Sequence, residues 1–375
     1  MRLRNRLHPA LTCQPHEAGQ TLVQFALVLM VLIGFLALAL DVGNAYVERR
    51  RMQNAADAGA LAGAREMCLG QSAATIRAAA ANYLVRNGMV AADITTDDIQ
   101  IIGNRVEVTA HEIVQTLIAR LLGILTIDVG AQATASCTGA NAACGLWPIS
   151  FDLSLYEQVQ CGKSMVIWDA DKDDQGVACV INGVPRDICQ CYDCDLDNNG
   201  SDDFVVMTDI SRGWMDFSST NDPIYTDNCK SQGCGASELR CRLLNGSGGR
   251  ITVPACVAGL RGVKAGVKAA VDDRSGDVVQ IGLYSGINCA TDNHCSGTDA
   301  QSYYITKFGC VSVGGWVQSF TLNPKPGMPS SYKKMKSKAI IATKECNSGS
   351  CVSFCGVGNG APAAPWELRA AGLTD

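Results

Sequence analysis

The chain of 375 residues is long enough for two or three domains, and its content of 47% hydrophobic and 18% charged residues excludes a disordered polypeptide. The formal net charge is −5, so the chain lacks the positive field that attracts nucleic acid, and we expect no nucleic-acid partner. Nineteen cysteines argue against a soluble enzyme of the reducing cytoplasm.

The first 40 residues have the pattern of a short leader followed by a membrane span. Residues 1–19 are assigned to a cytoplasmic leader. From Leu22 to Leu40 every residue except Gln24 is apolar or small, and a helix of this length is about 28 Å long, close to the hydrocarbon thickness of a bilayer. The length favours a retained membrane helix over a cleaved signal peptide, although the small residues Ala37 and Ala39 would fit a cleavage site.

The helix is expected to continue beyond the span, so that residues 20–70 form one long element. Gly59 and Gly63 lie four residues apart in an alanine-rich stretch, and small side chains at this spacing allow another backbone to approach closely. Packing within the chain and contact between subunits both remain open for this strip. Asp41, directly after the apolar run, is interpreted as an ordinary membrane-exit residue.

Two stretches of the N-terminal region carry a family resemblance. Residues 17–27 read EAGQTLVQFAL, and residues 40–64 read LDVGNAYVERRRMQNAADAGALAGA. An apolar span followed by a D-V-G step, an aromatic residue, a basic run and an alanine-rich helix resembles the N-terminal region of TadE/TadG-like proteins of the tight-adherence (Flp) pilus-assembly system. The resemblance names no family for the C-terminal part of the chain.

The resemblance implies a pilin-like membrane protein that contacts other pilus-assembly or pilin-like subunits through its N-terminal helix. In pilin-like relatives a prepilin peptidase cuts after a glycine, and a glutamate five residues later aligns the subunit. The matching positions here are Gly19, Gln20 and Gln24, and glutamine in place of glutamate leaves both cleavage and alignment open. A neutral residue suits a plain anchor, because an unpaired carboxylate is costly in lipid.

Residues 71–140 are predicted to form a small α/β unit. Ser72 is placed to cap a helix that ends at Asn87, and residues 99–109 alternate like two strands joined by a tight turn.

The second half of this unit is predicted to contain a helix and a strand. A short amphipathic helix is expected from Ile113 to Leu122, followed by a strand over residues 127–135. His111 falls where this helix begins and is assigned no catalytic role.

Residues 141–375 are predicted to form an extracytoplasmic, mostly β domain cross-linked by disulfides. The 18 cysteines beyond the leader are enough for nine disulfides, whose connectivity the sequence leaves open. The alternative is zinc binding by Cys189, Cys191 and Cys194, for which no second matching pair of cysteines is present. Because disulfides persist in oxidising compartments, we expect a single-pass cell-membrane protein with its N-terminus in the cytoplasm and its bulk outside.

Short β-type runs dominate this C-terminal region. Residues 237–244 are the main helical exception, and residues 257–271 are a second candidate helix. The β-type runs are residues 146–151, 164–168, 204–207, 278–284, 303–308 and 339–343.

An acidic loop in this region has the spacing of a calcium site. Gly200 stands where calcium loops turn sharply, but Val206 replaces the glutamate that closes an EF-hand. Calcium binding and a solvated acidic turn are both compatible with this pattern, and a second run over residues 169–173 fits it less well. The candidate calcium ligands are Asp195, Asp197, Asn199, Ser201 and Asp203.

The sequence carries no hydrolase, zinc-protease, nucleotide-binding or dinucleotide-binding motif, so we expect a protein that is not an enzyme. The expected fold class is α+β, with a long N-terminal membrane helix, a small α/β unit and a disulfide-rich, mostly β domain. The expected function is that of a minor pilin or assembly protein of a Flp/Tad-type pilus or related secretion system. The alternatives are a calcium-stabilised surface adhesin with a pilin-like anchor and a secreted thiol-disulfide oxidoreductase that would use Cys191 and Cys194.

Overall fold

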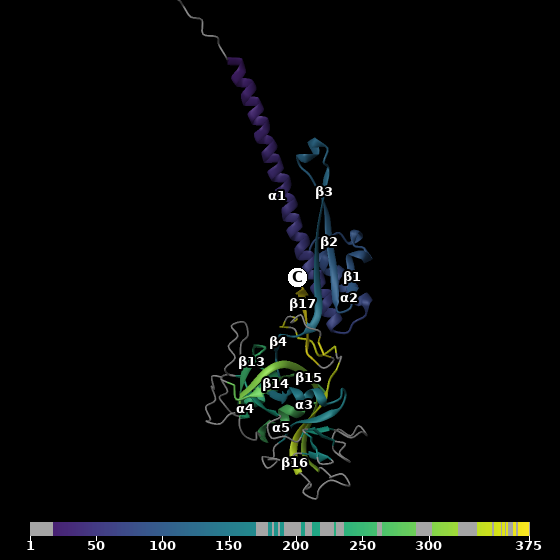
Figure 1. The fold of residues 1–375 in the computed structure, drawn as a ribbon, viewed down its shortest axis with the longest axis vertical. Coiled ribbons are helices and arrows are strands. Elements are labelled where there is room, and N and C mark those ends of the chain that lie inside the picture. The colour runs from purple at the N-terminus through teal and green to yellow at the C-terminus, as the bar shows by residue number, and fades with distance from the viewer. Residues whose placement is uncertain are drawn as a thin grey trace, which may run out of the picture.

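The computed structural model has a long helix, a small antiparallel sheet beside the second half of that helix, and a larger β-rich body at the far end (Figure 1). The predicted α+β class is confirmed. The α-helices are α1 (Ala18–Cys68), α2 (Ala73–Arg86), α3 (Leu153–Gln158), α4 (Ala236–Asn245) and α5 (Lys268–Asp272). The structure describes residues 18–169, 179–181, 184–186, 188–190, 204–206, 212–217, 229, 236–260, 265–289, 302–321, 336–346, 349–353, 355–356, 358, 363–364 and 367–374.

Helix α1 is a single element of 51 residues, about 77 Å long. No proline interrupts it, and its second half is rich in alanine, the residue with the highest helix propensity. It ends at Cys68, where Gly70 adopts a positive φ of 71° and lets the chain turn away. The expected continuous helix is therefore confirmed.

The small sheet lies against α1 and α2. Its strands follow the order β1-β2-β3-β17, and all its pairings are antiparallel. As predicted, the side chain of Ser72 accepts a hydrogen bond from the backbone N–H of Thr75 at the start of α2, and Asn87 caps its end. The strands are β1 (Ile99–Ile102), β2 (Arg105–Gln115), β3 (Thr126–Gly139) and β17 (Arg369–Thr374).

Two predictions for this unit are wrong, namely the helix from Ile113 to Leu122 and the position of His111 at the start of that helix. The expected helix from Ile113 to Leu122 is instead the end of β2 followed by a 3-10 turn, Ala119–Leu122, which closes at Gly123 with a φ of 87°. Because β2 pairs with β3 up to Gln115, ladder hydrogen bonds decide the conformation of a segment whose apolar pattern fits either element. His111 therefore lies within a strand, with Nδ1 3.6 Å from Oδ1 of Asp98.

The C-terminal strand also departs from the expected division at residue 140. Residues 369–374, which were predicted to belong to the C-terminal domain, pair with β3 and complete the small sheet. The pairing reaches from Thr374, opposite Thr134, to Arg369, opposite Gly139. The side chains of these six residues do not show which sheet edge the strand will join, because the pairing is made by hydrogen bonds between backbone groups.

The β-rich body is built on one large sheet. Strand β13 pairs with both β11 and β15, so β13, β11, β5, β14 and β15 close into a ring, and β16, β6, β10 and β9 extend it beyond β15. The nine strands, in sheet order, are β13 (Ala255–Leu260), β11 (Arg212–Asp216), β5 (Ile149–Asp152), β14 (Val278–Ile287), β15 (Ser302–Thr321), β16 (Lys336–Lys344), β6 (Ser164–Asp169), β10 (Phe204–Val206) and β9 (Ile188–Gln190). Two short pairs are β12 (Arg250–Thr252) with β4 (Ala142–Cys144) and β7 (Cys179–Ile181) with β8 (Val184–Arg186).

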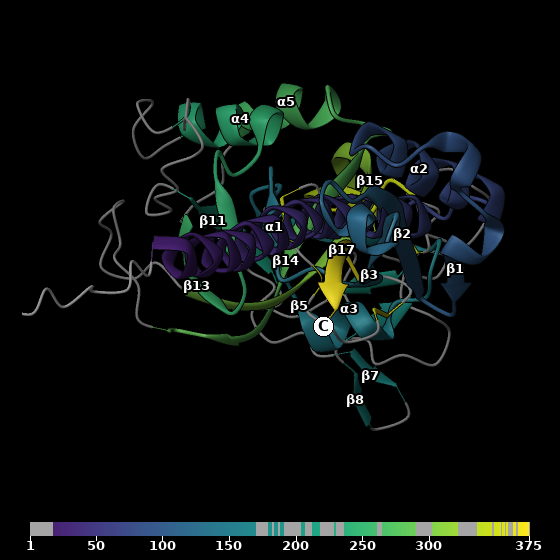
Figure 2. The same cartoon turned by 90° about the horizontal axis from the view of Figure 1, so that it is seen from above.

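These strands confirm the β-type runs of the sequence, each of which lies wholly or partly on a strand. The predicted helix at 237–244 is α4, whereas the candidate at 257–271 divides between strand β13 and the short helix α5. Helices α4 and α5 lie together along one side of the body (Figure 2). The buried core contains Trp168, with ring centroids 5.1 Å from Trp214 and 5.3 Å from Trp316.

Six disulfides join described cysteines, in agreement with the expected disulfide-rich domain. One of them, Cys68–Cys137, fastens the end of α1 to β3, with a Cα–Cα distance of 5.3 Å. The others are Cys144–Cys355, Cys161–Cys346, Cys229–Cys241, Cys256–Cys289 and Cys310–Cys351.

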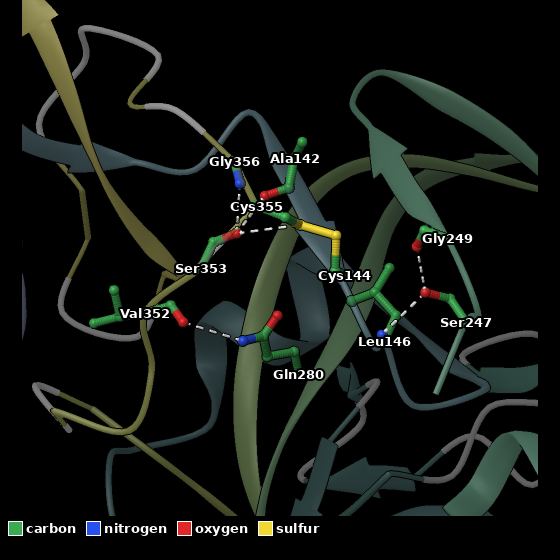
Figure 3. The surroundings of a disulfide bond; sticks show 10 residues. All are labelled: Ala142, Cys144, Leu146, Ser247, Gly249, Gln280, Val352, Ser353, Cys355 and Gly356. Atoms are coloured by element: carbon green, nitrogen blue, oxygen red, sulfur yellow. Dashed lines mark hydrogen bonds between the residues drawn. A yellow bond between two sulfur atoms is a disulfide. The ribbon is translucent and has the colours of Figure 1, made fainter. Parts of the chain in front are cut away.

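The C-terminal segment, residues 351–358, is held to the body by disulfides and hydrogen bonds, and Figure 3 shows those around Cys355. The disulfides of Cys351 and Cys355 hold it to β15 and β4. Between them, the hydroxyl of Ser353 donates to the carbonyl of Ala142 at 2.8 Å and accepts from the N–H of Gly356 at 3.0 Å. The chain then enters β17, so this segment ties both sheets together.

Candidate functional site

The first half of α1 presents a largely apolar surface, in which Thr21 and Gln24 are polar exceptions. The large apolar side chains from Leu22 to Leu40 are between 44% and 73% exposed. The helix projects from the rest of the molecule here (Figure 1), and it is the one helix of the described residues that is long and apolar enough to cross a membrane. A surface this large and apolar is a marker of a membrane or protein contact.

Asp41 stands at the end of this apolar run and is only 5% exposed. Its Oδ1 accepts from the N–H of Leu117 at 2.6 Å, and its Oδ2 accepts from the N–H groups of Ala119 at 2.7 Å and Ile118 at 3.1 Å. The N–H of Ala119, followed by that of Leu117, lowers the pKa of this carboxyl against the opposing effect of desolvation. Asp41 is therefore a clamp on the tip of the β2–β3 hairpin, which corrects its interpretation as an ordinary membrane-exit residue.

Two of the points at which the β2–β3 hairpin contacts α1 lie about the same distance apart along the strand and along the helix. Val106 in β2 packs at Gly63 of α1, and the tip meets Asp41. The helix rises about 33 Å from Asp41 to Gly63, and β2 rises about 31 Å from Val106 to Gln115. Figure 1 shows the hairpin running along α1 toward the exposed half of the helix. The clamp thus fixes the tip beside the last residues of the apolar run.

The hairpin tip, defined as residues 116–125, carries exposed apolar side chains of its own. Together with Ile113 at the end of β2, the side chains of Leu117, Leu121, Ile124 and Leu125 are between 51% and 81% exposed. This surface was not predicted from the sequence, because Ile113, Leu117 and Leu121 were assigned to an amphipathic helix that ended at Leu122. The signal that could have revealed it is the run from Ile113 to Ile127, whose only charged residue is Arg120.

The small-residue strip on the second half of α1 packs within the chain. A Cβ at Gly63 would lie 2.9 Å from Cγ1 of Val106, and one at Gly59 would lie 3.2 Å from Cγ1 of Val108. This packing confirms the intrachain alternative for this face of the helix. The rest of the strip is completely buried and consists of Ala55, Ala56, Ala60 and Ala64.

Gly63→Leu is expected to destabilise the packing of α1 on the small sheet by about 1–3 kcal/mol, because the side chain must displace Val106 in a packed core. The matched control is Gly43→Leu on the same helix, where a Cβ meets nothing within 4 Å. Thermal unfolding of the detergent-solubilised full chain measures both variants. Equal transition temperatures for the two variants would contradict the prediction.

The other predicted site residues lie on α1 or outside the part of the chain that the structure describes. Gly19 and Gln20 lie in the first turn of α1, and Gln24 is exposed on the same helix. The candidate calcium ligands Asp195, Asp197, Asn199, Ser201 and Asp203 lie outside the described residues, as do Cys191 and Cys194, so the calcium site stays a prediction. Within the described ranges, no group of three or more His, Cys, Asp or Glu side chains is arranged to hold a metal ion.

These features define a class of protein in which one membrane-length apolar helix continues into a helix-on-sheet unit and carries a disulfide-linked, β-rich body. Residues 19–66, which include the apolar run, Asp41 and the small-residue strip, match the family model Tad, described as "Putative Flp pilus-assembly TadE/G-like". No curated protein and no solved structure matches the chain. The resemblance of the N-terminal region is thus confirmed, and it associates the protein with Flp pilus assembly.

Proposed function

We propose that this protein is a membrane-anchored, extracytoplasmic component of a Flp/Tad-type pilus or a related secretion system. It acts as a minor pilin or assembly protein and not as an enzyme. The observation that carries this proposal is the division of α1 into an exposed apolar half and a half packed on the small sheet, within residues that match the TadE/G-like family.

The division of α1 suits an anchor with a rigid extension. The exposed half has the length of a bilayer span, while the packed half is held by Asp41, by the small-residue strip and by the Cys68–Cys137 disulfide. A helix fixed in this way holds the folded part of the protein at a set distance from the membrane.

The cysteines support the orientation. Arginines occur on both sides of the span, three before it and three at residues 49–51, so charge does not favour either direction. Disulfides persist in oxidising compartments, and every described disulfide lies on the C-terminal side of the span. These disulfides support the proposed orientation, with the N-terminus in the cytoplasm and the bulk outside.

The size of the β-rich body favours a minor pilin or an assembly protein over a repeating filament subunit. Its partners are the membrane and other pilus-assembly or pilin-like subunits. Because the small-residue strip is used within the chain, those subunits contact the exposed part of α1 or the body.

The anchor is tested by fractionation. Replacing Leu29 and Ile33 together by lysine costs about 5–7 kcal/mol of insertion free energy and is expected to remove the chain from the membrane fraction. The control replaces Val85 and Val90, which are exposed outside the span, and leaves the protein in that fraction. Membrane association of the Leu29 and Ile33 variant would refute the anchor.

The pilus role is tested by deletion and by the mature N-terminus. Loss of surface pili on deletion, restored by the wild-type chain, is the expected result, and normal pili would refute an assembly role. Mass spectrometry of the membrane and sheared-surface fractions identifies the first residue. A start at Gln20 indicates prepilin processing and a minor pilin, whereas a start at Met1 confined to membranes indicates an assembly factor.

A further inference from the structure

We propose that the hairpin tip inserts its apolar side chains into the interfacial region of the bilayer that α1 spans, on the extracytoplasmic side. The inference rests on the proposed anchoring and adds a second membrane contact, made by a segment about 80 residues further along the chain. It places a lipid surface, and not another protein, against the tip.

The height of the tip is fixed by Asp41. This carboxylate directly follows Leu40, the last residue of the apolar run, and it binds the backbone of residues 117–119. When residues 22–40 lie in the hydrocarbon, the tip lies at the boundary between acyl chains and headgroups. Leu121 and Leu125 then cannot avoid the membrane surface unless the clamp opens.

Tyr46 independently marks the headgroup level. It is exposed on α1, five residues beyond Asp41, which corresponds to about 8 Å along the helix axis. Tyrosine is enriched where a membrane helix passes the headgroups. The tip therefore lies on the membrane side of a residue that suits the interface.

The composition of the tip suits lipid. Between Ile113 and Ile127 there is no acidic residue or lysine, and the single charge is that of Arg120. A long cationic side chain at this level can keep its head among anionic phosphates while its stem lies along apolar surface. The tip itself holds no carboxylate: Glu112 and Asp128 lie on the strands behind it, and the carboxylate of Asp41 is bound by backbone N–H groups.

Most backbone N–H groups of the tip are hydrogen-bonded within the protein, which lowers the cost of moving the tip into an environment that is poor in water. Exposed N–H groups cost free energy in lipid unless they are paired inside the protein. Most N–H groups of the tip are paired: those of Leu117, Ile118 and Ala119 donate to Asp41, and those of Thr116, Leu121, Gly123 and Ile124 donate to tip carbonyls.

The test measures quenching of an introduced indole by two lipids, one brominated near the headgroup end of the acyl chain for the interface and one brominated near its terminal methyl for the middle of the span. The full chain is reconstituted in phosphatidylcholine and phosphatidylglycerol vesicles as Leu121→Trp, with Leu32→Trp in the span and Ile102→Trp at the end of β1 as controls. All three positions carry exposed apolar side chains, and emission of the parent protein is subtracted. Side chains that insert at the interface reach about 5–10 Å into the boundary, so the indole at position 121 should lose about half of its emission.

The controls separate this inference from the anchoring. Quenching at positions 32 and 121 but not at position 102 supports the tip contact. Quenching at position 32 alone leaves the anchor intact and overturns the tip contact. No quenching at any position overturns both. A blue shift at position 121 without quenching shows that protein covers the tip and also overturns the proposal.

Asp41→Asn, combined with Leu121→Trp, tests the clamp. A neutral amide loses the charge-assisted hydrogen bonds to the tip backbone, so quenching at position 121 should fall about twofold while quenching at position 32 is unchanged. Unchanged quenching at position 121 would show that Asp41 does not set the height of the tip and would overturn that step of the inference.

Discussion

Replacing Cys68 and Cys137 together by alanine is expected to lower the free energy of unfolding of the α1–sheet unit by about 4 kcal/mol. The bridge joins residues 69 positions apart, and no other cysteine lies between them, so no second cross-link shortens the loop that it closes. Opening it increases the conformational entropy of the unfolded chain by the full cost of closing that loop. The second half of α1 would then be held by packing, by Asp41 and by side-chain hydrogen bonds such as those from Arg51 to the carbonyls of Asn87 and Gly88.

Native-state hydrogen exchange measures this loss locally. The slowest amides of β2 and β3 should exchange roughly a thousandfold faster in the double alanine variant, since each 1.36 kcal/mol is a factor of ten. The control removes the Cys229–Cys241 bridge, which lies in the β-rich body and should leave these amides unchanged. Equal acceleration by both variants would show that the β-rich body and the small sheet open together, and it would contradict a local role for Cys68–Cys137.

The local signals in the sequence predict the elements that they encode. Ser72 and Asn87 bound α2 because capping is made by side chains within a few residues of the helix end. The long α1 follows from an uninterrupted run without proline. Residues 99–109 form two strands because their alternation and the turn at Gly103, with a φ of 61°, agree.

Only the apolar run of the candidate site could be predicted from the sequence, and the contacts of Asp41 with the hairpin tip could not. The apolar run from Leu22 to Leu40 is visible in the sequence, but the partners of Asp41 lie 76 to 78 residues away. The segment around the tip has an apolar pattern that suits a helix or a strand, and pairing with β3 decides between them. Contacts made through backbone groups, such as those of residues 117–119, leave no trace in side-chain identity.

The buried ion pair of α4 in the β-rich body could not be predicted from the sequence either. The helix at α4 was predicted, yet a sequence containing Glu238 and Arg242 suggests an exposed helix face, because such residues are seldom buried unless they are paired. Both are completely buried, with Nη2 of Arg242 3.1 Å from Oε1 of Glu238 and Nη1 3.0 Å from the carbonyl of Ser247. The neighbouring Leu239 and Leu243 enter the main core and bring this pair inside with them.

Breaking this pair is expected to have the second large effect on stability. Arg242→Met leaves the carboxylate of Glu238 in the core without its guanidinium, which costs about 3–5 kcal/mol. The matched control is Lys268→Met in α5, which removes the cation from an ion pair of the same spacing with Asp272. That pair is exposed, so the cost should be within about 1 kcal/mol.

A double-mutant cycle decides whether the pair or the volume of the side chains is responsible. The variant that combines Glu238→Leu with Arg242→Met removes both charges, and buried ion pairs replaced by apolar residues are often neutral or stabilising. It should therefore unfold at a higher denaturant concentration than either single variant, with a coupling energy of about 1–3 kcal/mol. If the two single losses simply add in the double variant, Glu238 and Arg242 contribute independently, and the loss does not come from breaking their ion pair.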